Sequence, residues 1–324
     1  MTGVKPTGDP HLGNYFGAIK PAIDLINANK GKGYIFIADV HALNAQKDPK
    51  FIRDKTYEVA AAWLACGLDA GKTVFYRQSD VPEVFELSSL LTNFTPKGSM
   101  NRAHAYKAII EKDGSDDNVN MGLYTYPILM AADILIMNTD VVPVGLDQKQ
   151  HIEIARDIAK AFNSVYKKDV LKLPAEHIQY TDSIVGFDGR KMSKSYGNTM
   201  GIFASSEDME KKVIKIPTDS KTPAEPKDKE SVIYGLMATF GVDKDYLRKF
   251  LAGGIGYGEA KKILAGQIDG YFAPMREKYK ALITDRKGLD LTLATGAVLA
   301  RKTAAATLKA VRETLGLTYL HGSS

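Results

Sequence analysis

The chain has 324 residues, of which 44% are hydrophobic, and its formal net charge is +5. This length suits one large domain with a smaller one, and no apolar run is long enough to span a membrane. The first residues lack the apolar segment of a signal peptide, and the single cysteine, Cys66, excludes an internal disulfide and a cysteine-rich metal centre. We therefore expect a cytoplasmic protein whose mild basicity permits nucleic-acid binding without requiring it.

The chain begins with a turn-rich segment, residues 2–8, and the run His11-Leu12-Gly13-Asn14 then opens an amphipathic helix. Pro21 is expected to kink this helix. A glycine-containing turn that leads into a helix N-terminus offers free N–H groups and a positive dipole end to an anion. The segment is therefore a candidate phosphate site, although a histidine at this place also fits a simple helix cap.

Strand and helix signals alternate in the next hundred residues. Residues 34–39 form a short apolar run that predicts a buried parallel strand, and residues 73–77 predict another. Between them Asp48 and Pro49 begin a helix that Gly67 ends. This alternation predicts a doubly wound α/β domain with a parallel, Rossmann-like sheet. Residues 83–111 are predicted to be helical, with a basic, solvated face.

The most apolar stretch, residues 123–137, contains one charged residue, Asp133. A carboxylate in a buried helix is costly unless it is paired or hydrogen-bonded. Two interpretations stay open from the residues alone. Asp133 either bonds a neighbouring amide or hydroxyl, or accepts a hydrogen bond from a ligand.

Residues 140–145 predict a further buried strand, and residues 145–151 start the helix that follows it. Open α/β sheets bind ligands at the carboxyl ends of their strands. Asp147 and Gln148 lie at such an end, which makes them better site candidates than their residue types alone would.

The run Lys191-Met192-Ser193-Lys194-Ser195 carries two lysines and two hydroxyls, with glycines on both sides. Such a run predicts a mobile loop that can wrap phosphates, and it also fits an ordinary solvated turn. Residues 217–231 predict a linker, after which helices predominate at about 231–240, 243–252, 257–282 and 289–315. The sequence contains neither a metal-ligand pattern nor a glycine-rich Walker phosphate loop.

Taken together, the run at 11–14 and the run at 191–195 resemble the two signatures of class I aminoacyl-tRNA synthetases. Across nearly the whole chain the sequence is similar to the bacterial tryptophanyl-tRNA synthetases. The runs that carry this resemblance are Pro6-Thr7-Gly8, His11 to Tyr15, Leu123 to Leu135, Val142 to Gly145, and Asp147 to His151.

The resemblance implies the roles of individual residues. It implies catalytic roles for His11, Asn14, Lys191, Ser193 and Lys194. The residues implied to bind ATP are Lys5, Thr7, Gly8, His11, Gly13, Asn14, Gly145, Asp147, Gln148, Lys191, Met192, Ser193, Lys194 and Ser195. Those implied to bind tryptophan are Tyr126, Met130, Asp133, Val142, Val144 and Gln148, with Asp133 accepting the indole N–H and Met130 packing on the ring. Indole N–H only donates, so an ionised aspartate suits it.

The resemblance also implies the activity and the domains. A family member forms tryptophanyl-adenylate from tryptophan and ATP, with magnesium held mainly by ATP, and then charges tRNA(Trp); it is a homodimer. Residues 1–186, with a returning helix at about 289–324, are expected to form the catalytic domain. Residues 187–198 are expected to form the mobile signature loop and residues 199–288 the anticodon-binding domain. The sequence departs from the family at its start, where Met1 lies almost on the turn. We expect this to weaken the first strand and one wall of the amino-acid pocket.

Three alternatives remain open. A tyrosyl-tRNA synthetase shares the fold, but normally uses a tyrosine of the first strand that is absent here. A nucleotidyltransferase without a tRNA substrate would not need the long helical segment. A catalytically silent RNA-binding relative would not need both signatures.

Overall fold

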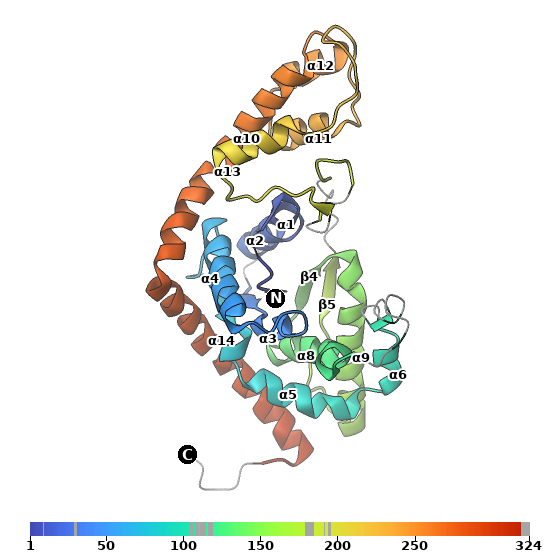
Figure 1. Cartoon of the computed structure of the whole chain (residues 1–324). Coiled ribbons are helices and arrows are strands. Elements are labelled where there is room, and N and C mark those ends of the chain that lie inside the picture. Colours follow the sequence, from blue (N-terminus) through green and yellow to red (C-terminus); the bar gives the residue numbers. More distant parts are fainter. Residues whose placement is uncertain are drawn as a thin grey trace.

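The computed structural model describes residues 1–8, 10–28, 31–103, 106–107, 110, 115, 119–178, 185–190, 192–193 and 196–318, and only the backbone of Asp147. Figure 1 shows a body that contains the strands and, above it, a lobe formed by α10 (Ser206–Ile214), α11 (Val232–Thr239) and α12 (Lys244–Ala252). The long helix α13 (Tyr257–Thr284) runs from this lobe to the body, where α14 (Arg286–Leu315) continues (Figure 1).

The body contains two short parallel sheets. Strands β1 (Thr2–Val4), β2 (Gly33–Ile37) and β3 (Thr73–Arg77) pair in that order, with Ile35 opposite both Thr2 and Phe75. Strand β4 (Val141–Val144) pairs with β5 (Ala175–Ile178). The amino group of Met1 donates to the carbonyl of Val141 at 2.9 Å. Strand β1 therefore connects the two sheets, and the predicted strands at 34–39, 73–77 and 140–145 are confirmed as β2, β3 and β4.

The alternation of side chains along β2 divides the core in two. Ile35 and Ile37 pack into one hydrophobic core, while Phe36 between them packs into the other, as expected for successive residues of a strand. The first core includes side chains from α2 (Lys20–Ala28), α4 (Pro49–Ala65) and the helical lobe. The second includes side chains from α5 (Glu83–Leu91), α8 (Met121–Ile136), α9 (Lys149–Tyr166) and α14. Helices thus cover both faces of the sheet, which is the predicted doubly wound arrangement.

The C-terminal helix approaches the sheet closely at a glycine. Gly296 of α14 lies so near β3 that a Cβ atom on it would come within 1.8 Å of the carbonyl oxygen of Phe75. Only glycine fits this place, because backbone atoms cannot move aside as a side chain can. The returning helix is therefore docked on β3 at this position.

One predicted helix needs correction, and two elements were not predicted. The helix predicted over 83–111 is broken, because α5 ends at Leu91, a 3₁₀ turn covers Thr92–Phe94, and α6 is the short segment Lys97–Asn101. Pro96 has no N–H and holds the preceding residue extended, which interrupts the helix; most of residues 104–111 lies outside the described part. Helix α10 and strand β5 were not predicted. In β5 the residues are half-exposed and do not form an apolar run.

The first helix is irregular where a kink was predicted. Short helix α1 (Leu12–Asn14) continues into a π-helical turn, Tyr15–Ile19, before α2 begins. The N–H of Lys20 bonds to the carbonyl of Tyr15, a π-type bond that comes just before Pro21, which has no N–H to donate. Among the described helices none is long and apolar enough to cross a membrane.

Candidate active site

Two adjoining cavities lie at the carboxyl ends of β1 and β4. The larger, of about 620 Å³, contains the glycine turn at residues 7–8 and is here named the glycine-turn cavity. The smaller, of about 170 Å³, has Asp133 in its wall and is named the Asp133 cavity. Both cavities share the lining residues Thr2, Gly3, Lys5, Met130, Val142 and Gln148. A molecule in one cavity can therefore reach a molecule in the other.

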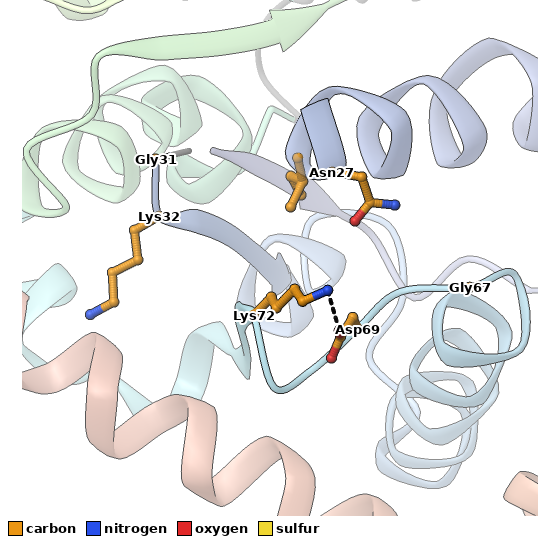
Figure 2. A pocket seen from close by; sticks show the side chains of 7 residues that line it. Asn27, Gly31, Lys32, Gly67, Asp69 and Lys72 are labelled. Carbon is orange, nitrogen blue, oxygen red and sulfur yellow. Dashed lines mark ion pairs between the residues drawn. The ribbon is translucent and has the colours of Figure 1, made fainter. Parts of the chain in front are cut away.

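Another cavity, of about 700 Å³, lies at the opposite edge of the sheet. It is lined near the amino ends of β2 and β3, and Figure 2 shows Lys72 pointing toward Asp69 while Lys32 points away. The Lys72 and Asp69 charges approach to 3.4 Å and neutralise each other. None of the predicted site residues lines this cavity, so it is not the candidate active site.

The glycine-turn cavity is formed by a local sequence pattern. After β1 the chain turns at once, with the N–H of Thr7 bonded to the carbonyl of Lys5 at 2.9 Å and Gly8 at a φ of 108°. His11 then caps α1: its Nδ1 accepts from the N–H of Asn14 at 3.3 Å, and the Asn14 Oδ1 accepts from the N–H of His11 at 3.1 Å. This capping box fixes the helix N-terminus at the cavity wall.

Lys5 lies where the two cavities meet. Its ammonium is 5.7 Å from the centre of the Tyr126 ring, a cation–π distance. Partial burial lowers the pKa of Lys5 below its ordinary value, although the residue as a whole is exposed to solvent. A positive charge at this junction favours anionic groups from either side.

The segment after the lysine-rich run is joined to the N-terminus of α1. Main-chain bonds connect Leu12 to Met200 at 3.0 Å and Ile202 to Pro10 at 3.1 Å. Within the run, the N–H of Gly13 donates to the sulfur of Met192 at 3.3 Å. The two signature segments, far apart in the sequence, are therefore neighbours in the fold.

The floor of the Asp133 cavity is a buried polar cluster. Asp133 Oδ2 lies 2.9 Å from His41 Nε2, and the Gln78 amide nitrogen donates to both carboxylate oxygens at 2.9 Å. These side chains come from α3 (Asp39–Ala42), from the 3₁₀ turn Gln78–Asp80 and from α8. Burial raises the pKa of Asp133, while its hydrogen bonds with His41 and Gln78 oppose that rise.

Two turns before Asp133, α8 also brings an aromatic side chain with a polar tip to the cavity. The Tyr126 hydroxyl is bonded to the Nε2 of His151 on α9, and burial raises the pKa of Tyr126. Met130 and Val142 supply apolar surface, and Gln148 also lines the cavity. The cavity thus combines apolar walls with a few fixed polar groups, the usual make-up of a small-molecule site.

Residues 1–284 match the family described as tRNA synthetases class I (W and Y). The chain belongs to this family. Relatives named tryptophan–tRNA ligase are 46% identical to it, one from Neisseria meningitidis that covers 98% of this chain and 97% of its own length and one from Xanthomonas campestris at 98% and 76%. The crystal structure of the Campylobacter jejuni tryptophanyl-tRNA synthetase complexed with ADP and tryptophan has a TM-score of 0.90 at 41% identity, and covers 97% of this chain and 98% of that chain.

Half of the residues implied for ATP line one cavity of this synthetase. Those that line the glycine-turn cavity are Lys5, Thr7, Gly8, His11, Asn14, Gly145 and Gln148. Gly13, Met192 and Ser193 do not line it: the N–H of Gly13 donates to the sulfur of Met192, and the N–H of Ser193 donates to Asn198 Oδ1 at 2.8 Å. Lys191, Lys194, Ser195 and the side chain of Asp147 lie outside the described residues.

The residues implied for tryptophan also gather, with one exception. Tyr126, Met130, Asp133, Val142 and Gln148 line the Asp133 cavity. Val144 does not, and lies instead in the wall of the glycine-turn cavity, because β4 carries it two residues beyond Val142 toward the carboxyl end of the strand.

His41 and Gln78 were missed by the sequence analysis. Each lies within four residues after the end of a predicted strand, His41 after β2 and Gln78 after β3. The rule that drew attention to Gln148, that ligands bind at the carboxyl ends of parallel strands, applies to both. The described residues contain no group of three or more His, Cys, Asp or Glu side chains that could hold a metal ion.

Proposed function

We propose that this synthetase activates L-tryptophan with ATP, forming tryptophanyl-adenylate and pyrophosphate, and then transfers tryptophan to the 3′-terminal adenosine of tRNA(Trp). The observation that carries the proposal is the junction of the two cavities at Lys5, Met130 and Gln148. An amino acid in the Asp133 cavity would direct its carboxylate toward a phosphate in the glycine-turn cavity. Relatives named tryptophan–tRNA ligase support tryptophan as that amino acid.

Recognition of tryptophan is assigned to the Asp133 cavity. Asp133 would accept the indole N–H, and Met130 would pack on the ring. Tyr126 and Gln148 would bind the ammonium and carboxylate of the amino acid. A site that bonds a ring N–H rejects analogues without it more strongly than an apolar slot would, because the buried acceptor would be left unpaired.

Binding of ATP is assigned to the glycine-turn cavity. The helix N-terminus at His11 and Asn14 and the adjoining turn supply N–H groups. A tryptophan carboxylate oxygen would attack the α-phosphorus, and the bond to the leaving pyrophosphate would break. Lys191 and Lys194 would neutralise the charge that develops on pyrophosphate.

Magnesium enters this proposal only with ATP. The described residues supply no cluster of carboxylates for it, so it would be held by phosphate oxygens and water. Its chemistry would be to screen the phosphate charges.

The second half-reaction is assigned to the helical lobe and the body together. Residues 199–288 would contact the tRNA, while a hydroxyl of the terminal ribose attacks the adenylate carbonyl in the body and AMP leaves. The proposal includes a homodimer in the cytoplasm, which sedimentation analysis and cell fractionation would test.

The decisive experiment is ATP–pyrophosphate exchange with each of the twenty amino acids. Exchange with tryptophan alone is expected, followed by charging of tRNA(Trp). Exchange with tyrosine would indicate the sister specificity. Exchange without any tRNA charging would indicate a nucleotidyltransferase, and no exchange at all would indicate a catalytically silent relative.

A further inference from the structure

Asp133 is already hydrogen-bonded before any amino acid enters its cavity. Its side chain is 2% exposed, and its two neighbours are equally enclosed, with His41 at 6% and Gln78 at 0%. His41 Nε2 is 2.9 Å from Oδ2, and the Gln78 amide nitrogen is 2.9 Å from both oxygens. A carboxylate offers about four lone-pair positions, so this cluster leaves room for one further donor.

The roles within the cluster depend on the charge of Asp133. When Asp133 is ionised it can only accept, and the His41 ring then donates from Nε2. The Gln78 amide cannot be turned round, because its Oε1 accepts the main-chain N–H of His41 at 3.3 Å. The remaining ring atom, Nδ1 of His41, is buried and makes no hydrogen bond among the described residues. Both side chains therefore direct donors at Asp133, and Gln78 is locked in that orientation.

These donors decide which form of Asp133 the cavity presents. A carboxylic acid in so buried a place favours its neutral form, which carries an O–H donor. An O–H donor would face the indole N–H, which is a donor as well and would find no partner. Two donors fixed on the carboxylate stabilise the charged form, which is acceptor-only. A phenol could also donate a hydrogen bond to Asp133, but its oxygen would then need donors for its own lone pairs. The neighbouring donors, on His41 and Gln78, are already bonded to Asp133.

We propose that His41 and Gln78 determine specificity for the ring N–H of the substrate, by holding buried Asp133 as a charged acceptor at the floor of the cavity. This inference rests on the proposed function, since it takes tryptophan as the amino acid. His41 and Gln78 act through Asp133 and are positioning residues. The role makes the preference for the ring N–H dependent on pH, which a purely structural role would not do.

Other groups also set the charge of Asp133. The charged or titratable groups that influence it or line its cavity are Asp39 on α3, Tyr76 on β3, Tyr126 on α8, Lys5 and the Met1 amino group. Asp39 raises the pKa of Asp133, and the Asp133 charge helps to raise that of Tyr76. None of these groups is altered in the variants below, so a change in pH dependence reports on His41 or Gln78.

The test compares L-tryptophan with L-benzothienylalanine, in which sulfur replaces the ring N–H. ATP–pyrophosphate exchange gives kcat/KM for each across the acid to neutral range. The variants are His41→Leu and Gln78→Leu, which remove a donor, and His41→Gln, whose amide can still donate. The matched control is Asn163→Leu, which removes a buried amide that bonds the main chain of residues 170–171, outside both cavities.

We expect the wild type to prefer tryptophan and to lose that preference as Asp133 becomes protonated on acidification. In His41→Leu and Gln78→Leu this loss should begin at least about one pH unit higher, so that the preference falls about tenfold at a fixed pH on that limb. His41→Gln should restore the wild-type profile. Asn163→Leu should lower stability and leave the preference unchanged.

Two results would overturn the inference alone. In the first, kcat/KM for tryptophan falls in both leucine variants, but the preference for tryptophan over benzothienylalanine and its pH profile stay unchanged. The cluster would then serve only to stabilise the fold. The other needs no variant and so does not depend on their folding: a wild-type preference that is constant as the pH is lowered to the limit of the folded state. Absence of tryptophan-dependent exchange in the wild type would instead overturn the proposed function together with this inference.

Discussion

The two cavities of this synthetase are built in opposite ways. The floor of the Asp133 cavity is a closed cluster of three buried side chains from three different elements. In the glycine-turn cavity, the groups suited to an anion are main-chain N–H groups and a capping box in one short segment that begins at Lys5 and ends at Asn14, while β4, α4 and α8 complete the walls. A neutral ring with one donor requires a single acceptor held rigidly away from water. A triphosphate carries several charges, and N–H groups at a helix terminus with nearby lysines suffice to bind it.

The contrast predicts separable defects. Changes in the Asp133 cluster should alter the use of tryptophan, and changes around the glycine turn should alter the use of ATP. Lys5 lies at the junction of the two cavities, so a change at Lys5 should alter the use of both substrates.

The largest effect is expected for Lys194→Ala. Removal of one charge that stabilises departing pyrophosphate should raise the barrier to adenylate formation by about 3 kcal/mol, roughly a hundredfold in rate. Tryptophan binding should stay nearly unchanged, since the proposal assigns Lys194 to the phosphates and not to the amino acid. Pre-steady-state adenylate formation and tryptophan titration measure the two properties. Lys211→Ala, which removes an exposed lysine paired with Glu207 on α10, is the control; near wild-type activation in Lys194→Ala would refute the catalytic assignment of the loop.

Asp133→Ala comes next. Loss of a charged hydrogen bond should lower kcat/KM for tryptophan by about 2 kcal/mol, roughly thirtyfold, with the KM for ATP unchanged. The melting temperature should also fall, because the buried Nε2 atoms of His41 and Gln78 would lose their hydrogen bonds to the carboxylate. The same exchange assay with tryptophan or ATP varied separates the two constants. A parallel rise in both KM values would mean that Asp133 acts only through folding.

Lys5→Met should reduce the use of both substrates. A lost charged contact to an anion amounts to about 1.5 kcal/mol, or roughly tenfold in kcat/KM. Because burial lowers the pKa of Lys5, the wild type should lose activity as the pH rises through that lowered value, while Lys5→Arg should keep it. Lys32→Met is the matched control: Lys32 lies 5.9 Å from the centre of the Tyr34 ring, at the far edge of the sheet (Figure 2). Equal falls in kcat/KM in Lys5→Met and Lys32→Met would mean that Lys5 has no special role at the junction of the cavities.

The smallest effect is expected for Asn14→Ala. Loss of half the capping box should destabilise the start of the helix by about 1 kcal/mol and raise the KM for ATP, with little change for tryptophan. Ser205→Ala is the control, because Ser205 caps α10 in the lobe by accepting from the N–H of Asp208. It should lower the melting temperature comparably without altering the KM for ATP. An unchanged KM in Asn14→Ala would separate the cap from nucleotide binding.

Local patterns were sufficient for much of the fold. Short apolar runs predicted β2, β3 and β4, and apolar spacing with caps predicted α4, α8, α9 and the helices from α11 onward. The two signature runs and the family resemblance were also visible in the sequence, and the match over residues 1–284 confirms the family. The proposed domain boundaries and the roles of individual site residues stay predictions.

The failures share a cause. Strand β5 is half-exposed and is held in place by its pairing with β4. Its own residues therefore lack the apolar pattern that predicts a strand. The broken helix at 92–96 depends on the stereochemistry of one proline against an otherwise helical pattern. In both cases the structure depends on one feature, the neighbouring strand or a single proline, and not on the average secondary-structure propensity of the surrounding residues.

The sequence by itself determined the elements, the glycine turn with its helix cap, and the presence of one carboxylate in an apolar helix. Whether that carboxylate was structural or functional could not be decided from residues 123–137, because its partners are 92 and 55 positions away in the chain. Only the packing of α8 against the ends of β2 and β3 brings His41 and Gln78 onto Asp133. Hydrogen bonds act over about 3 Å, so the roles of these side chains depend on a tertiary arrangement that no local pattern contains.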